Sequence, residues 1–205
     1  MIDRHMLPLL GRVYAAPARR LAAAGVSADA VTFSGFALGL LAALLIALEQ
    51  PLAGLAALLA NRVLDGLDGA VARLAGPTER GAFLDIALDF FVYAAIPFGF
   101  ALADPGRNAL AAAALLCAFM GTACSFLAYA VIAARRGLLS SAYPQKGIYY
   151  LGGLTEGAET ITCLAVMCLA PAWFPALAWG FAALCLVTTV TRWWWGIRQF
   201  RGSED

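Results

Sequence analysis

Four aspartates lie within 25 residues of a chain that is otherwise poor in charge. Asp65 and Asp68 are three residues apart, and Asp85 and Asp89 are four apart, so each pair shares one face of a helix. Ionisable groups inside apolar segments are costly and usually functional. Carboxylates that crowd together repel one another, and their oxygens are the ligands that Mg²⁺ and Mn²⁺ prefer. We therefore predict a divalent metal site of all four aspartates, which we expect to hold two ions.

A metal site of this kind suits phosphate chemistry. Bound divalent ions can bridge a diphosphate, neutralise charge on a leaving group and align an attacking hydroxyl. Small residues beside the first aspartate pair would let a nucleotide or a diphosphate approach the helix backbone closely: they are Gly66, Gly69, Ala70 and Ala72. Arg73 follows them and offers a fork of donors to phosphate oxygens.

The segments that must position these residues belong in a bilayer. Of the 205 residues, 62% are hydrophobic and 13% are charged, and the mean hydropathy is +0.80. The net charge of +1 argues against nucleic acid as a partner, because neutralising its backbone requires a basic excess. Six apolar stretches are long enough to span a bilayer, near 30–49, 52–74, 81–103, 108–134, 148–170 and 173–196. We predict an all-α membrane protein with six transmembrane helices.

The first 26 residues differ from the rest, because arginines alternate with hydrophobic residues at helical spacing. This pattern predicts an amphipathic helix on the membrane surface. We expect three parts: a juxtamembrane helix (1–26), a six-helix transmembrane catalytic domain (27–198) and a cytoplasmic tail (199–205). With the N-terminus inside, nearly all basic residues fall on the cytoplasmic side. We therefore expect a multi-pass protein of the cell (inner) membrane with both termini and the active site facing the cytoplasm.

The signature of a known family runs through the aspartate region. Residues 65–73 read D-G-L-D-G-A-V-A-R, and Gly81, Asp85 and Asp89 follow at fixed distances. The pattern D-x2-D-G-x2-A-R-x7-G-x3-D-x3-D resembles the signature of the CDP-alcohol phosphatidyltransferases, with every fixed position filled. The resemblance implies a metal-dependent enzyme of phospholipid biosynthesis. Such an enzyme moves a phosphatidyl group from a CDP-linked lipid such as CDP-diacylglycerol to an alcohol and releases CMP.

The resemblance also implies roles for individual residues. Asp65, Asp68 and Asp85 would hold metal against the CDP diphosphate. Asp89 would complete the site and act as the general base for the acceptor hydroxyl. The signature residues expected at the nucleotide and diphosphate are Gly66, Gly69, Ala72, Arg73 and Gly81. Asn61 lies outside the signature, one turn before Asp65, and either reaches the nucleotide or packs against a neighbouring helix. The family commonly forms homodimers, and the small-residue helix faces are compatible with one.

The acceptor site is less defined by the sequence. Arg135, Arg136 and Lys146 flank the cytoplasmic mouth and could bind a polyol phosphate, although such residues also serve topology and binding of anionic lipid. Glu156 and Glu159 lie one turn apart in the fifth span and are expected to face the polar cavity. There they either contact the acceptor or pair with Arg192 or Arg62. The acceptor is either an unphosphorylated alcohol or a polyol phosphate.

Three other activities fit some of these features. In one, CDP carries a small alcohol and diacylglycerol attacks. In another, the protein is an intramembrane prenyltransferase, although those enzymes resemble longer bundles with two well-separated aspartate motifs. The third is an ion carrier, for which the sequence lacks a convincing internal repeat.

Overall fold

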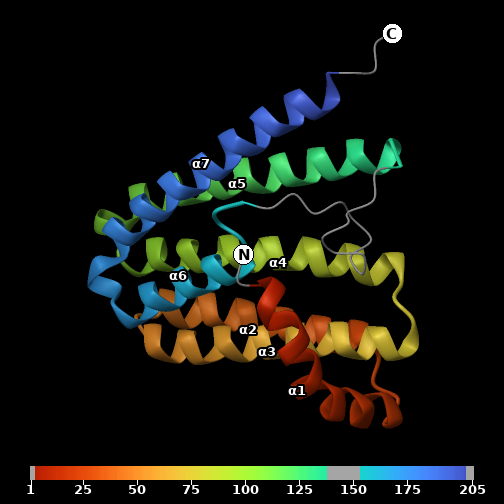
Figure 1. Cartoon of the computed structure of the whole chain (residues 1–205). Helices are drawn as coiled ribbons and strands as arrows, with labels where there is room; N and C mark the ends of the chain where they lie inside the picture. The colour runs from red at the N-terminus through yellow and green to blue at the C-terminus, as the bar shows by residue number, and fades with distance from the viewer. Residues whose placement is uncertain (1–2, 138–152, 202–205) are drawn as a thin grey trace.

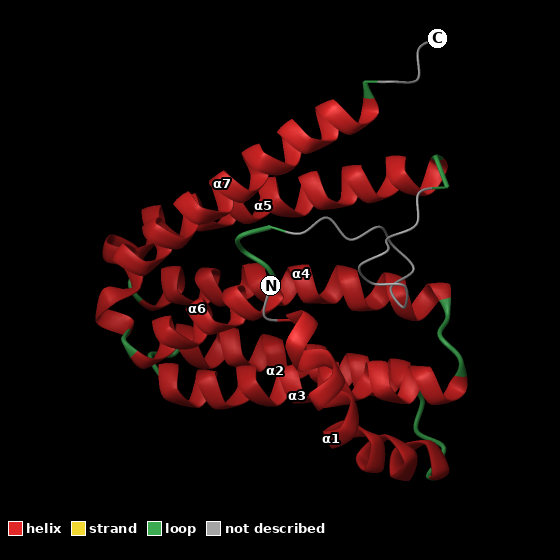
Figure 2. Ribbon diagram, in the orientation of Figure 1, coloured by secondary structure: helices red, strands yellow, loops and turns green. Residues whose placement is uncertain are grey.

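The computed structural model describes residues 3–137 and 153–201. Within these ranges every regular element is a helix, as Figure 2 shows, so the prediction of an all-α fold is confirmed there. The elements are α1 (Asp3–Ala23), α2 (Ala28–Ala47), α3 (Pro51–Ala75), α4 (Glu79–Ala103), α5 (Pro105–Arg135), α6 (Gly157–Leu169), a 3₁₀ turn η1 (Pro171–Trp173) and α7 (Phe174–Phe200).

Four segments in the described part of the chain are long and apolar enough to cross a membrane: α2, α4, α5 and the continuous segment Pro171–Phe200. Helix α6 is apolar but has only 13 residues, and residues 148–152 of the predicted fifth span lie outside the described ranges. Helix α3 has 25 residues, but its second half carries the polar and charged side chains of the site. The six-span arrangement and the membrane-surface position of α1 therefore stay predictions.

Local sequence signals set the helix ends. Ser27 accepts a hydrogen bond from the Ala30 amide at 3.2 Å and caps α2, and Thr78 caps α4 through the Gly81 amide at 3.0 Å. Pro51 begins α3, where its missing amide hydrogen costs nothing. Gly76 ends α3 with a φ of 95°, which a residue with a side chain adopts only at a cost, and the chain then turns into α4.

Helix α2 lies at the centre of the site-forming half of the molecule. It packs extensively against both α3 and α4, which make far fewer contacts with each other (Figure 1). Glycines permit this close packing: a Cβ on Gly39 would lie 2.5 Å from a Val92 methyl group, and one on Gly99 would lie 2.5 Å from the Ala43 carbonyl oxygen. Although the connection from α3 to α4 is short, the two helices are therefore held together mainly through α2.

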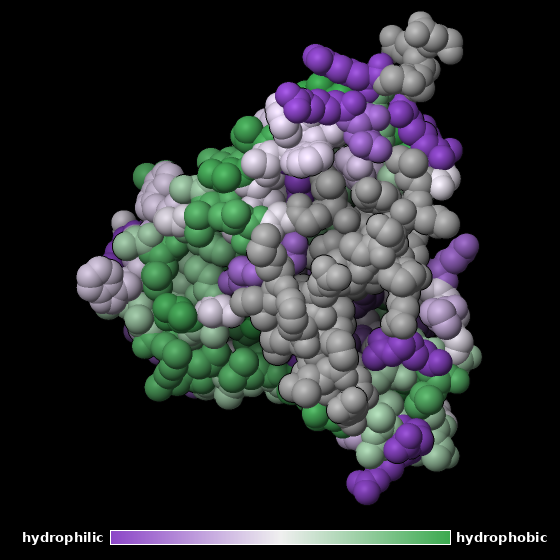
Figure 3. Space-filling model, viewed as in Figure 1, coloured by the Kyte–Doolittle hydropathy of each residue, from purple (hydrophilic) through white to green (hydrophobic). Residues whose placement is uncertain are grey.

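The remaining helices complete two hydrophobic cores. The larger core contains residues from every α-helix from α2 to α7. In it Phe100 stacks on Phe174, with ring centroids 4.4 Å apart. The smaller core fixes α1 on α3 and α2 through Ala18, Val31 and Val71. In the view of Figure 3, hydrophobic residues cover a broad area of the left half, and most of the strongly hydrophilic ones gather toward the right, where α5 and α7 end.

Candidate active site

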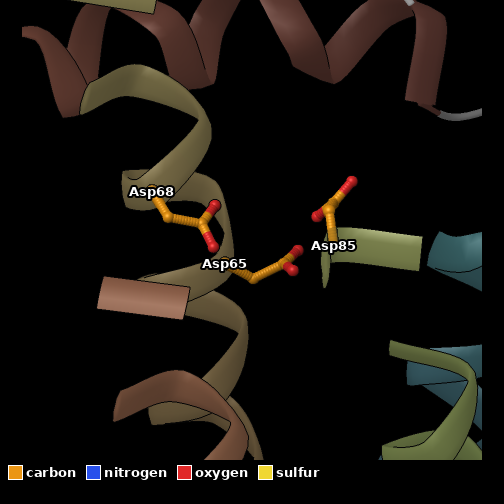
Figure 4. A group of neighbouring side chains, drawn as sticks. All are labelled: Asp65, Asp68 and Asp85. Atoms are coloured by element: carbon orange, nitrogen blue, oxygen red, sulfur yellow. The ribbon is translucent and has the colours of Figure 1, made fainter. Parts of the chain in front are cut away.

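Three of the four predicted aspartates converge from two helices. One carboxylate oxygen from each of Asp65, Asp68 and Asp85 lies within 4.8 Å of the others. Figure 4 shows the three side chains directed into the same space, two of them from α3 and the third from α4. Asp68 is buried, Asp65 is partly buried and Asp85 is exposed, so the cluster opens at one side.

Helix α2 forms the floor of this site. Thr32 donates a hydrogen bond from its Oγ1 to Asp68 Oδ2 at 2.6 Å, and Asn61 donates from Nδ2 to the Gly35 carbonyl at 2.8 Å. The first contact orients a predicted metal ligand, and the second joins α3 to α2. A pocket between α2, α3 and α4 is lined by Thr32, Gly35, Phe36, Asn61, Asp65, Asp68, Asp85, Leu88, Asp89 and Val92.

Asp89 lines the same pocket but has a different partner. Its Oδ1 lies 2.7 Å from Nη2 of Arg62, and its Oδ2 accepts a hydrogen bond from the Tyr93 hydroxyl at 3.2 Å. Neither Arg62 nor Tyr93 was predicted from the sequence as a partner of Asp89. Arg62 precedes Asp65 by one helical turn, so its spacing was a signal that could have placed it there.

The donor set fits a hard divalent cation. The three converging groups are all carboxylates, which supply the oxygen ligands that Mg²⁺ and Mn²⁺ bind. Carboxylates held this closely in a poorly solvated place repel one another, and a divalent ion between them removes that repulsion. Such an ion could also hold a diphosphate and stabilise a leaving phosphate.

The small residues of the signature have distinct surroundings. A Cβ on Gly66 would lie 2.5 Å from Cε2 of Tyr14, so Gly66 provides the close contact between α3 and α1. Among the residues that the structure describes, a Cβ on Gly69 would meet only Nη1 of Arg73, at 3.3 Å. Ala72 is half-buried and Arg73 is exposed. Gly69 and Arg73 therefore lie where a nucleotide could approach, whereas the Gly66 surface is occupied by a ring of the same chain.

Gly81 and Asn61, two further residues predicted at the nucleotide, also make structural contacts. The Gly81 amide donates to the Thr78 cap of α4 at 3.0 Å. The Asn61 amide group joins α3 to α2, and its Oδ1 accepts a hydrogen bond from Nε of Arg62 at 2.7 Å. These contacts give both residues a structural role that requires no bound ligand. Their roles at the nucleotide stay predictions.

The predicted acceptor residues differ in their surroundings. Arg135 ends α5 and is exposed, and Arg136 donates from Nη2 to the Phe200 carbonyl at 3.3 Å. Glu156 is buried and accepts from the Gly153 amide at 3.0 Å at the start of α6. Lys146 lies outside the described residues. Buried Arg192 of α7, which donates to the Thr122 carbonyl at 3.0 Å, adds a cation within the bundle.

Comparison with known proteins assigns the class. Residues 26–193 match the family model of the CDP-alcohol phosphatidyltransferases. The chain belongs to the CDP-alcohol phosphatidyltransferase family and is a phosphotransferase enzyme. The prenyltransferase and ion-carrier alternatives are thereby set aside.

Particular relatives support this assignment along the whole chain. Inner membrane protein YnjF of Escherichia coli (strain K12) is 51% identical over 204 residues, which cover 100% of this chain and 99% of the relative. A crystal structure of Mycobacterium tuberculosis phosphatidylinositol phosphate synthase (PgsA1) with CDP-DAG bound superposes with a TM-score of 0.70 at 25% identity, covering 95% of this chain and 98% of the synthase.

The same synthase in complex with manganese and citrate has a TM-score of 0.67 at 25% identity, covering 94% of this chain and 92% of that one. The apolar helices and the inner-membrane relative together indicate an integral protein of the inner membrane.

Proposed function

We propose that this enzyme transfers a phosphatidyl group from a CDP-linked lipid to an alcohol and releases CMP, in a reaction that requires a divalent metal. The observation that carries the proposal is the convergence of Asp65, Asp68 and Asp85 within 4.8 Å at the signature of the family. The related synthase crystallised with CDP-DAG supports a CDP-linked lipid as the donor. CDP-diacylglycerol is therefore the first donor to test.

Asp65, Asp68 and Asp85 would hold the metal, either Mg²⁺ or Mn²⁺. When bound, the metal would neutralise charge on the diphosphate as CMP departs. The manganese complex of the related synthase supports a divalent cation. The sequence predicts two ions, but a second ion bound by Asp89 would require that carboxylate to leave Arg62, which is 2.7 Å away.

The chain's own residues would then carry out the transfer as follows. The acceptor hydroxyl oxygen attacks the phosphorus that carries the lipid, and the bond from this phosphorus to the CMP oxygen breaks. Asp89 takes the hydroxyl proton as the general base, and its own orientation is fixed by the Tyr93 hydroxyl and Arg62. Gly69 and Ala72 make room for the nucleotide, and exposed Arg73 binds phosphate oxygens.

For the acceptor we propose an alcohol of the polyol phosphate class. Arg135 is exposed at the end of α5, where its guanidinium is available to a phosphate. Arg136, Lys146 and Glu156 complete the proposed acceptor set. An unphosphorylated alcohol, or CDP-linked small alcohol with diacylglycerol as the attacking group, would show itself as a different product in the same assay.

We further propose that residues 1–26 lie on the inner membrane surface, that residues 27–198 form six spans, that residues 199–205 are a cytoplasmic tail, and that the enzyme works as a homodimer. The orientation of the protein in the membrane is tested with a variant that lacks the five native cysteines. Into this variant a single cysteine is introduced, either as Arg73→Cys or as Arg107→Cys. In intact cells a membrane-impermeant maleimide should label Arg107→Cys and spare Arg73→Cys. The reverse labelling would place the active site outside.

The reaction is tested by supplying purified enzyme in detergent with CDP-diacylglycerol, Mn²⁺ and one acceptor at a time. Mass spectrometry of the lipid product identifies the acceptor. Asp89→Asn should keep binding of the CDP-lipid and lose turnover, because the amide cannot accept the proton. Retained turnover in Asp89→Asn would remove this residue from the general-base role.

A further inference from the structure

Arg62 places a fixed positive charge inside the active-site pocket. Its side chain is 14% exposed and rises from α3 one turn before Asp65. Nη2 lies 2.7 Å from Asp89 Oδ1, and Nη1 lies 3.5 Å from Asp65 Oδ2. The guanidinium therefore lies between the metal cluster and the proposed general base.

The guanidinium is held in this orientation by two neighbours. Nε donates to Asn61 Oδ1 at 2.7 Å, and Nη1 donates to the Tyr93 hydroxyl at 3.2 Å. Tyr93 in turn donates to Asp89 Oδ2 at 3.2 Å. Both Asp89 oxygens thus have a donor, and two residues, Arg62 of α3 and Tyr93 of α4, fix the plane of this carboxylate.

We propose that Arg62 is a positioning residue that holds Asp89 toward the acceptor and takes the place of a second metal ion between Asp65 and Asp89. An ion shared by these two carboxylates would bind the oxygen atoms that face the guanidinium. It would also be repelled by a positive charge that never dissociates. The inference rests on the proposed function for the role of Asp89, but the number of bound ions is independent of that role.

The number of bound metal ions and the turnover rate test two different parts of the proposal. Wild type binds one Mn²⁺ per chain, at the cluster of Asp65, Asp68 and Asp85. Arg62→Gln removes the fixed charge, so a second Mn²⁺ binds, while turnover falls about 10–100-fold because Asp89 loses the partner that orients it. Arg62→Lys keeps the charge without the fork of donors, so it binds one ion and also turns over more slowly.

The experiment counts bound Mn²⁺ by electron paramagnetic resonance of the free ion, with purified full-length protein in detergent and no lipid substrate. CMP release is measured on the same preparations. Arg20→Gln, at an exposed position on α1, is the matched control and should behave as wild type in both measurements.

Two Mn²⁺ per wild-type chain would overturn the proposal, as would only one Mn²⁺ per chain in Arg62→Gln or wild-type turnover in that variant. If Arg62→Gln does not fold, the number of bound Mn²⁺ in wild type and in Arg62→Lys still tests the proposal. Two Mn²⁺ per chain in either protein would overturn it. If wild type releases no CMP with any acceptor, the proposed function fails, yet the ion count continues to test the placement of Arg62.

Discussion

Replacing Thr32 with valine removes one hydrogen bond from a proposed metal ligand and changes little else. The Thr32 hydroxyl donates to Asp68 Oδ2 at 2.6 Å from the floor formed by α2. Valine has nearly the same shape, so the packing of α2 against α3 is kept. The hydroxyl also lies 3.0 Å from the Ala28 carbonyl, a contact that adds little because this oxygen already faces the helix amides.

The size of the effect follows from the type of bond. Hydrogen bonds to charged groups contribute about 1.5–3 kcal/mol. Because each 1.4 kcal/mol corresponds to about tenfold in an equilibrium constant, the range is roughly 10–150-fold. If the whole bond orients Asp68 for the metal, the affinity for Mn²⁺ should fall by that factor in Thr32→Val.

The assay titrates Mn²⁺ against CMP release at a saturating concentration of CDP-diacylglycerol and follows free Mn²⁺ in parallel. Thr162→Val is the matched control, because within residues 3–137 and 153–201 its exposed hydroxyl bonds only the Ala158 carbonyl of its own helix, at 2.7 Å. The control should leave the Mn²⁺ requirement unchanged. An unchanged requirement in Thr32→Val as well would refute the reasoning that Thr32 orients a metal ligand.

Two further predictions concern the close helix contacts. Gly99→Ala places a methyl group 2.5 Å from the Ala43 carbonyl oxygen and should destabilise the fold by about 1–3 kcal/mol, measured by thermal unfolding in detergent. Gly180→Ala, whose added methyl group meets no atom of the described residues within 4 Å, is its control, and equal loss in both would show that the contact is not tight. Gly66→Ala should destabilise by a similar amount through Tyr14, and adding Tyr14→Ala should restore part of the loss. Independent, additive effects of these two changes would contradict the contact between α1 and α3.

The metal cluster was predictable because it depends on helical periodicity within two segments. Spacings of three and four residues put each aspartate pair on one face, and the short connection at Gly76 keeps the start of α4 close to the end of α3. The starts of α2, α3 and α4 depend on signals of the same local kind, at Ser27, Pro51 and Thr78. These are local properties, which a single sequence carries.

The partners across helices were not predictable by the same means. Whether Arg62 reaches Asp89 depends on the rotation of α3 relative to α4, and that rotation is set by how both helices pack on α2. The packing is itself fixed by contacts such as Gly39 against Val92, which join residues far apart in the sequence. The contact between Gly66 and Tyr14 of α1 likewise joins residues far apart in the sequence. The sequence did not reveal this contact and predicted Gly66 at the nucleotide instead.

CMP release as a function of Mn²⁺, compared between wild type and Asp68→Ala, tests the central claim that the aspartate cluster holds the metal that drives phosphatidyl transfer. Asp68 is chosen because it is buried in the cluster and is oriented by Thr32. The account predicts acceptor-dependent release that saturates with Mn²⁺ in wild type, stops on chelation and is lost in Asp68→Ala. Release that continues in a chelator, or that survives at the wild-type rate in Asp68→Ala, would contradict it.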